Sequence, residues 1–176
     1  MNKTIKEILI ILVLSTVTGL IANALSSKGI PLSGDYADRK AIDTAKINSV
    51  DLKQKGKLNK DGFYQPVNIS AETAKQLFDD GAVFIDGRLP EEFTAGHIKG
   101  AINLDYKVFK DKTKEEKIEI LKDVKKDQLI VSYCGSDSCE ISIDNGYEIA
   151  KAGYDYVKIY LGGYKDWKNK GYPTEK

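Results

Sequence analysis

An alternation of strand-like and helix-like segments, which starts at Pro66, constrains the fold of this chain most. Strands are predicted at 82–86, 101–104, 129–133 and 156–161, and helices at 71–78, 90–95, 115–122, 139–151 and 164–170. Ser70 is a suitable cap for the first helix, and Pro90 and Gly153 suit a helix start and a helix end. Strands that alternate with helices predict an α/β fold with a mostly parallel sheet flanked by helices.

Cys134 is the most reactive side chain at the expected binding edge of this sheet. In open α/β sheets, ligands bind beyond the carboxyl ends of the strands. Cys134 directly follows the strand 129–133, and Asp86-Gly87-Arg88 follows the strand 82–86, so we expect both on one face. Backbone N–H groups and a helix dipole in front of a thiol lower its pKa. A small buried hydrophobe is the alternative interpretation of this cysteine.

The N-terminal segment from Ile8 to Leu25 carries no charge. As a helix it spans about 27 Å, close to the thickness of the hydrocarbon core of a bilayer. Because Lys3 and Lys6 precede it, we expect a single-pass anchor over residues 1–27, with the soluble domain on the outer, periplasmic or extracellular, side. Secretion after signal cleavage is the alternative, since Ala22-Asn23-Ala24 resembles a cleavage site.

Composition narrows the remaining classes of function. A membrane-proximal linker with room for a short helix is expected at 28–65, and the main domain at 66–176. The net charge of +1, from 27 basic and 26 acidic residues, argues against nucleic-acid binding. Two cysteines and one histidine form no zinc pattern, and we expect no metal and no cofactor.

Three fragments in order resemble the signatures of rhodanese-like domains. The first joins Ile85-Asp86-Gly87-Arg88 to Pro90–Phe93 and Gly96–Asn103, the second is Tyr133-Cys134, and the third is Gly153-Tyr154 with Leu161-Gly162-Gly163 and Trp167. The resemblance covers Val67 to Thr174, and the N-terminal segment is similar to the leader of some membrane-attached members. It implies a parallel sheet flanked by helices and a sulfurtransferase activity.

By this resemblance, Cys134 carries the sulfur. Its thiolate attacks a sulfane sulfur, becomes a persulfide, and passes the outer sulfur to an acceptor thiol or to cyanide. The N–H groups of the substrate-binding loop would cradle the persulfide anion; they belong to Gly135, Ser136, Asp137, Ser138 and Cys139. The implied partners are a sulfur donor and a thiol acceptor, either small molecules or proteins.

The end of the loop that follows Cys134 differs from the pattern of the family. Many active rhodaneses carry an arginine late in the loop, but here Cys139 and Glu140 are the fifth and sixth residues after Cys134. The acidic residues Asp137 and Glu140 predict weak activity on thiosulfate and better turnover of a neutral or protein-bound donor, and Glu140 also argues against phosphate chemistry. The alternative interpretation of these two acids is a capping pair at the helix start. Arg88 is the candidate for the missing positive charge.

The remaining candidates have structural alternatives. Cys139 is either inert filler or a redox partner that resolves the persulfide or forms a disulfide with Cys134. We expect Asp86 and Arg88 to pair with neighbours, and His97 to hold a turn. The second hypothesis for the whole domain is therefore a non-catalytic module, which binds a protein or senses redox state through the two cysteines.

Overall fold

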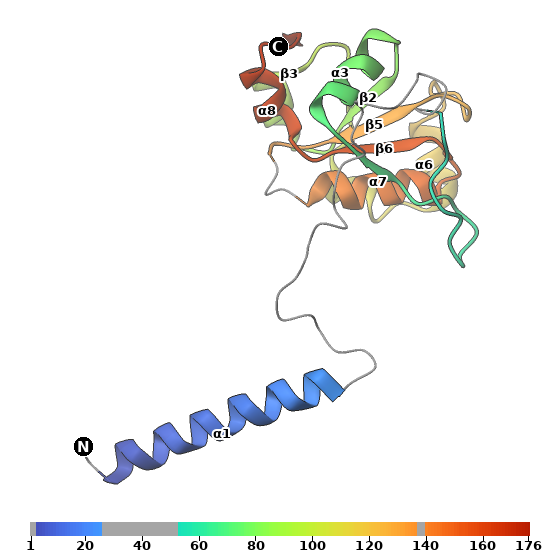
Figure 1. Ribbon diagram of the computed structural model, residues 1–176. Coiled ribbons are helices and arrows are strands. Elements are labelled where there is room, and N and C mark those ends of the chain that lie inside the picture. Colours follow the sequence, from blue (N-terminus) through green and yellow to red (C-terminus); the bar gives the residue numbers. More distant parts are fainter. Residues whose placement is uncertain (1–2, 26–52, 137–139) are drawn as a thin grey trace. The chain divides into compact units, whose positions relative to one another are not determined.

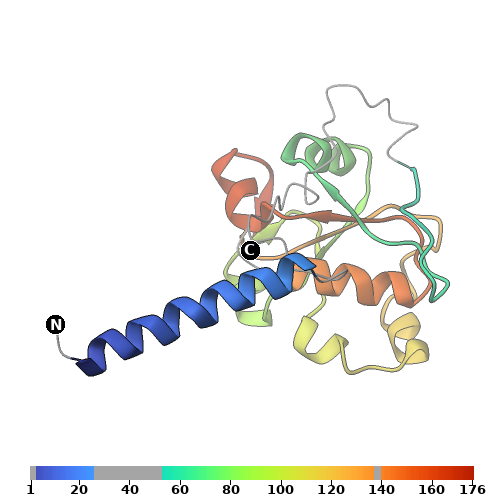
Figure 2. The same cartoon turned by 60° about the horizontal axis from the view of Figure 1, so that its bottom comes forward.

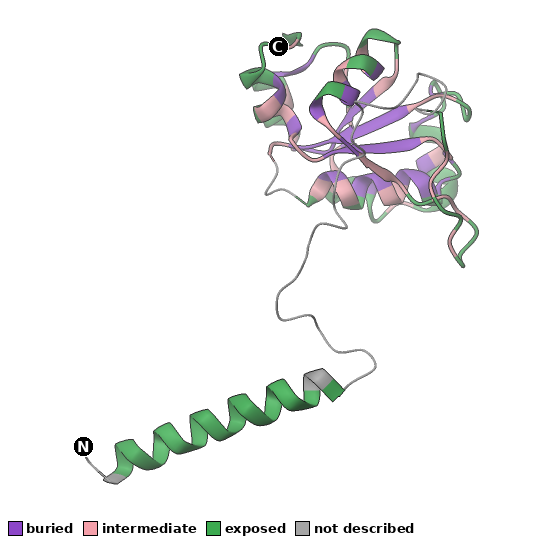
Figure 3. Cartoon of the chain, viewed as in Figure 1, coloured by how far each residue is buried: buried purple, intermediate pink, exposed green. Residues whose placement is uncertain are grey.

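The computed structural model describes residues 3–25, 53–136 and 140–176, and it divides the chain into two compact units, Met1–Asp38 and Arg39–Lys176. Helix α1 (Lys3–Leu25) makes up the described part of the first unit (Figure 1). Its stretch Thr4–Ala22 has a mean hydropathy of 2.1 and no buried share, so α1 is long and apolar enough to cross a membrane. Figure 3 shows that its described side chains are exposed along its length.

The second unit is built on a parallel five-stranded sheet, in the order β1-β6-β5-β2-β4. Its strands are β1 (Val67–Ile69), β2 (Val83–Asp86), β4 (Ile102–Asn103), β5 (Ile130–Tyr133) and β6 (Val157–Tyr160). The three central strands are almost wholly buried, as expected for a parallel sheet covered on both faces (Figure 3). The predicted α/β fold with a mostly parallel sheet is confirmed.

Helices cover both faces of this sheet (Figures 1 and 2). They are α3 (Ala71–Asp79), α4 (Pro90–Ala95), α5 (Tyr106–Phe109), α6 (Lys114–Ile120), α7 (Ile141–Lys151) and α8 (Gly163–Asn169). On the face of α3 and α8, Trp167 lies 5.4 Å from the rings of both Phe78 and Phe84. On the face of α7, a second apolar cluster contains Ile85, Ile130 and Ile149.

Most predicted elements are present with ends shifted by a residue or two, and four short elements were missed. Ser70 caps α3 by accepting a hydrogen bond from the N–H of Thr73, as expected. Strand β1, helix α5, and the antiparallel pair β3 (His97–Ile98) and β7 (Thr174–Glu175) were not predicted. Two-residue strands show no periodicity, because their pairing is decided by contacts distant in sequence.

Helix α7 begins at Ile141 rather than at Cys139, and Glu140 is its N-cap residue without a side-chain cap hydrogen bond. The predicted helix start at Cys139 is therefore two residues too early, and the expected capping pair of Asp137 and Glu140 stays a prediction. Asp137 itself lies outside the described residues.

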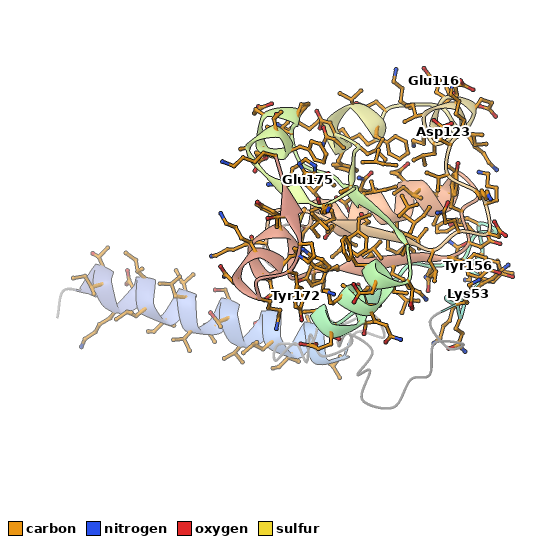
Figure 4. All side chains as sticks on the ribbon, turned by 90° about the horizontal axis from the view of Figure 1, so that it is seen from above. Lys53, Glu116, Asp123, Tyr156, Tyr172 and Glu175 are labelled. Carbon is orange, nitrogen blue, oxygen red and sulfur yellow. The ribbon has the colours of Figure 1, made fainter. Side chains whose placement is uncertain are left out.

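The described end of the predicted linker packs on the domain. Lys55 pairs with Asp155 at 2.8 Å, and the Nζ of Lys158 donates to the carbonyl of Gln54 at 2.7 Å. Lys53 and Tyr156 mark this edge of the domain in Figure 4. The remainder of the linker, residues 28–52 with the expected short helix, lies outside the described residues.

Candidate functional site

Two strand ends meet at one edge of the sheet, as the sequence predicts. Asp86 and Tyr133 are register partners at the ends of β2 and β5, and the N–H of Gly87 donates to the carbonyl of Tyr133 at 3.0 Å. Cys134 and the turn Asp86-Gly87-Arg88 therefore leave the sheet side by side. Burial raises the pKa of Tyr133 well above its ordinary value, with the charge of Asp86 acting in the same direction.

The start of α8 holds the backbone on either side of Cys134. The N–H of Tyr164 donates to the carbonyl of Cys134 at 2.8 Å, and the N–H of Lys165 donates to the carbonyl of Gly135 at 2.9 Å. Gly163 makes this approach feasible, because its φ is +63° and a Cβ there would lie 2.5 Å from the carbonyl oxygen of Cys134. The turn at Gly162-Gly163 thus receives the cysteine loop.

Arg88 lies beside the same loop, and a carboxylate balances its charge. Its guanidinium pairs with Asp86 at 2.6 Å and donates to the carbonyl of Gly96 at 2.8 Å. It also lies 4.7 Å from the ring centre of Tyr164, and only 7% of Arg88 is exposed. A Cβ on Gly135 would lie 3.6 Å from the Cδ of Arg88. The expected pairing is confirmed, and the role of Arg88 in binding substrate stays a prediction.

The side chain of Cys134 is fully buried, with 0% of the residue exposed. One contact of its sulfur is with the carbonyl oxygen of Ser136, 3.6 Å from Sγ, in the direction that the thiol donates. Asp137, Ser138 and Cys139 lie outside the described residues, and both the cradle of N–H groups and the disulfide stay predictions.

Polar side chains that sequence reasoning missed fix the start of α7. The hydroxyl of Ser132 donates to the carbonyl of Ser142 at 2.9 Å, and the amide of Asn145 donates to the carbonyl of Leu104 at 3.2 Å. All three polar residues are fully buried. A serine within the apolar strand 129–133 was the signal that could have identified this anchor.

His97 holds a turn, as expected. Its Nδ1 lies 2.9 Å from the carbonyl oxygen of Phe93, and its ring stacks on that of Phe93 at 3.7 Å. Its Nε2 lies 3.3 Å from Glu175 on β7. Across residues 3–25, 53–136 and 140–176, no three His, Cys, Asp or Glu side chains gather as a group that could hold a metal ion.

Known proteins are similar to this domain in sequence and in fold. The family model "Rhodanese-like domain" matches residues 70–170. Thiosulfate sulfurtransferase 16, chloroplastic, of Arabidopsis thaliana is 33% identical over 115 residues, which cover 62% of this chain and 93% of that protein. Thiosulfate sulfurtransferase GlpE of Pseudomonas entomophila is 33% identical over 107 residues, which cover 61% of this chain and 88% of that protein.

Other relatives are longer than the matching region. Protein HIGH ARSENIC CONTENT 1, mitochondrial, of Arabidopsis thaliana is 28% identical, and the match covers 61% of this chain and 65% of that protein. The crystal structure of BH2092 protein from Bacillus halodurans superposes with a TM-score of 0.51 at 21% identity, covering 63% of this chain and 76% of that one, and it supports the fold alone. On the match over residues 70–170, which is more than half of its length, the chain belongs to the rhodanese-like domain family.

Proposed function

We propose that this chain is a membrane-anchored sulfurtransferase that carries sulfane sulfur as a persulfide on Cys134. The family and its relatives named thiosulfate sulfurtransferase support a sulfur-transfer role. The observation that carries the proposal is the position of Cys134 at the carboxyl end of the central strand, with its backbone held by two N–H groups of α8. This is the edge at which parallel sheets bind ligands.

The proposed reaction has two displacements. In the first, the Cys134 thiolate attacks the sulfane sulfur of the donor, a new S–S bond forms, and the donor's S–S bond breaks with its electron pair on the leaving group. In the second, an acceptor thiolate attacks the outer sulfur of the persulfide, and Cys134 leaves as a thiolate. No external oxidant is needed, because the sulfane sulfur is passed from donor to Cys134 and from Cys134 to acceptor at the same oxidation level.

The described residues around Cys134 contribute to the reaction by positioning the cysteine loop rather than by supplying positive charge. Hydrogen bonds from the N–H groups of Tyr164 and Lys165 fix the carbonyls of Cys134 and Gly135, and this holds the backbone that carries the sulfur. The thiol of Cys134 donates a hydrogen bond to the carbonyl of Ser136, and this hydrogen bond is lost when the thiol gives up its proton to form the attacking thiolate. N–H groups of the loop, including those at 137–139, would then stabilise the persulfide anion.

The charge balance favours a donor other than thiosulfate. The positive charge of Arg88 is shared with Asp86, and the described loop residues Gly135, Ser136 and Glu140 include no basic side chain. Thiosulfate is a dianion that such a site attracts poorly. We therefore propose that a persulfide, small or protein-bound, is the better donor.

Steady-state turnover of the full chain tests this proposal. Thiocyanate formation is measured with cyanide as acceptor and with either thiosulfate or a small-thiol persulfide as donor, and Cys134→Ser is the control. We expect turnover with both donors, a higher kcat/KM for the persulfide, and none in the control. A thiosulfate efficiency equal to that of the persulfide would contradict the charge argument, and no turnover with either donor would contradict the enzyme.

Full burial of Cys134 favours the second candidate, a non-catalytic module that binds a protein or senses redox state. A module that only binds a protein has no use for an accessible sulfur, whereas a redox sensor needs one, so the burial favours the protein-binding form of this candidate. Single-turnover loading separates the two candidates, because only the enzyme gains a sulfur atom that an acceptor thiol can remove.

The location on the outer side of a membrane is a further part of the proposal, and it rests on α1 and the lysines before it. Buried Cys134 is a poor target for labelling, so a Lys168→Cys variant in a Cys134→Ser, Cys139→Ser background is better suited, since Lys168 is exposed. We expect an impermeant maleimide to label this variant in intact cells. Labelling only after lysis would place the domain inside.

A further inference from the structure

A cavity of about 240 Å³ adjoins the Cys134 loop, and we call it the α8 groove. It is lined by Ser136, Gly162, Lys165, Asp166 and Asn169. The cysteine loop contributes Ser136, and the other residues come from α8 and its first turn. Among the described residues, no apolar side chain lines the groove, so it suits a small polar ligand.

The groove and the sulfur share one residue. Ser136 lines the groove, and its carbonyl oxygen lies 3.6 Å from the sulfur of Cys134. On the opposite wall, Lys165 is hydrogen-bonded through its backbone to Gly135. A persulfide lengthens the cysteine side chain by about 2 Å, the length of an S–S bond. Cys134 itself does not line the groove, and Ser136 is the residue that links the groove to the sulfur that is transferred.

The groove carries one positive and one negative side chain. Lys165 is exposed and forms no ion pair with any residue of the described ranges. The carboxylate of Asp166 accepts a hydrogen bond from the hydroxyl of Tyr160 at 2.6 Å, which fixes its position. The amide of Asn169 adds a donor and an acceptor. A ligand with charges of both signs complements these walls, whereas the carboxylate of Asp166 repels a dianion.

We propose that the α8 groove seats the acceptor, and that this acceptor is a small thiol with both a carboxylate and an ammonium group. Lys165 binds the carboxylate, Asp166 faces the ammonium, and the thiol points toward Ser136 and the persulfide. The acceptor thiolate attacks the outer sulfur, a new S–S bond forms on the acceptor, and Cys134 departs as a thiolate. This inference rests on the proposed sulfur transfer and names Lys165 as its specificity-determining residue.

Four thiols that differ only in their charged groups test this assignment. They are L-cysteine with both groups, 3-mercaptopropionate with the carboxylate alone, cysteamine with the ammonium alone, and 2-mercaptoethanol with neither. The full chain is loaded with persulfide, and the rate of sulfur loss is measured against thiol concentration. Each variant is compared with the wild type on the same thiol, so that differences in thiol reactivity cancel.

We expect Lys165→Met to raise KM about fivefold for L-cysteine and 3-mercaptopropionate, as for the loss of an exposed ion pair. For cysteamine and 2-mercaptoethanol, we expect the KM of Lys165→Met to stay near that of the wild type. We expect kcat to change little for all four thiols. Asp166→Asn keeps a partner for Tyr160 and raises KM for L-cysteine and cysteamine instead. Lys165→Arg keeps the positive charge, so we expect it to retain the wild-type KM for the two thiols that carry a carboxylate.

Lys168→Met is the matched control, because Lys168 lies on the same helix and is exposed but does not line the groove. We expect it to leave all four KM values as in the wild type. Equal effects of Lys165→Met on all four thiols, or no effect on any, overturn the groove assignment while sulfur loss from Cys134 still stands. Failure of every thiol to remove sulfur from the wild type overturns the proposed function itself.

Discussion

The substitution Gly163→Ala adds a single methyl group at the contact between α8 and the cysteine loop, and it tests that contact. A Cβ at Gly163 would lie 2.5 Å from the carbonyl oxygen of Cys134, 2.9 Å from the nitrogen of Ser136 and 3.0 Å from the carbonyl carbon of Gly135. All three are backbone atoms, so no side-chain rotation relieves the clash. Gly163→Ala must therefore displace the loop or the start of α8.

The loss of stability expected for Gly163→Ala has two parts. The left-handed backbone at Gly163, with φ of +63°, costs a residue with a side chain about 1–2 kcal/mol. Overpacking against backbone adds about 1–3 kcal/mol. Gly171→Ala separates these parts, because Gly171 has a φ of +70° and nothing within 4 Å of its Cβ position. We therefore expect Gly171→Ala to lose only the stability that the left-handed backbone costs.

Urea denaturation of the full chain in detergent micelles measures both variants. We expect Gly163→Ala to lower the free energy of unfolding by about 1–3 kcal/mol more than Gly171→Ala does. We also expect persulfide formation to slow by up to about a hundredfold in Gly163→Ala alone, because an ångström-scale displacement of a reacting group has that effect. Equal losses of stability and unchanged sulfur loading in the two variants would refute the packing of α8 on the loop.

Two further predictions concern buried charges. Asp86→Asn leaves the buried guanidinium of Arg88 without its carboxylate, so the free energy of unfolding in urea should fall by about 3–5 kcal/mol; a loss below 1 kcal/mol would contradict the pairing. Burial lowers the pKa of Lys158 from 10.5 to about 8, so between these values the unfolded chain holds more protons and stability rises with pH. Lys158→Met removes this rise, and its stability relative to the wild type should fall by about 2 kcal/mol between about pH 7.5 and about pH 9.5. A difference between the two proteins that is constant with pH would show that Lys158 is not buried as a cation.

Local patterns were sufficient to predict the sheet and the edge where Cys134 lies. Apolar runs predicted the central strands, and chain order at the ends of β2 and β5 placed Cys134 beside Asp86 and Arg88. The sequence left open whether Cys134 is buried, because part of its surroundings comes from α8, which follows it by almost thirty residues; its complete burial agrees with the alternative interpretation of a small buried hydrophobe. The same reason explains the missed pair of β3 and β7, whose partners are far apart in the sequence.

The neutralisation of Arg88 was only partly foreseen. The sequence shows Asp86 two residues before Arg88, and it does not show that the carbonyl of Gly96 and the ring of Tyr164 complete the surroundings of the guanidinium. Such a setting depends on how three segments pack together. For the same reason, the α8 groove emerged from the structure and not from any motif.

Intact-mass spectrometry of the full chain after exposure to a small-thiol persulfide tests the central claim most directly. The account predicts a gain of one sulfur atom, localised to Cys134 by peptide mapping, absent from Cys134→Ser and removed by an acceptor thiol. A chain that gains no sulfur, or a Cys134→Ser variant that gains as much as the wild type, would contradict it.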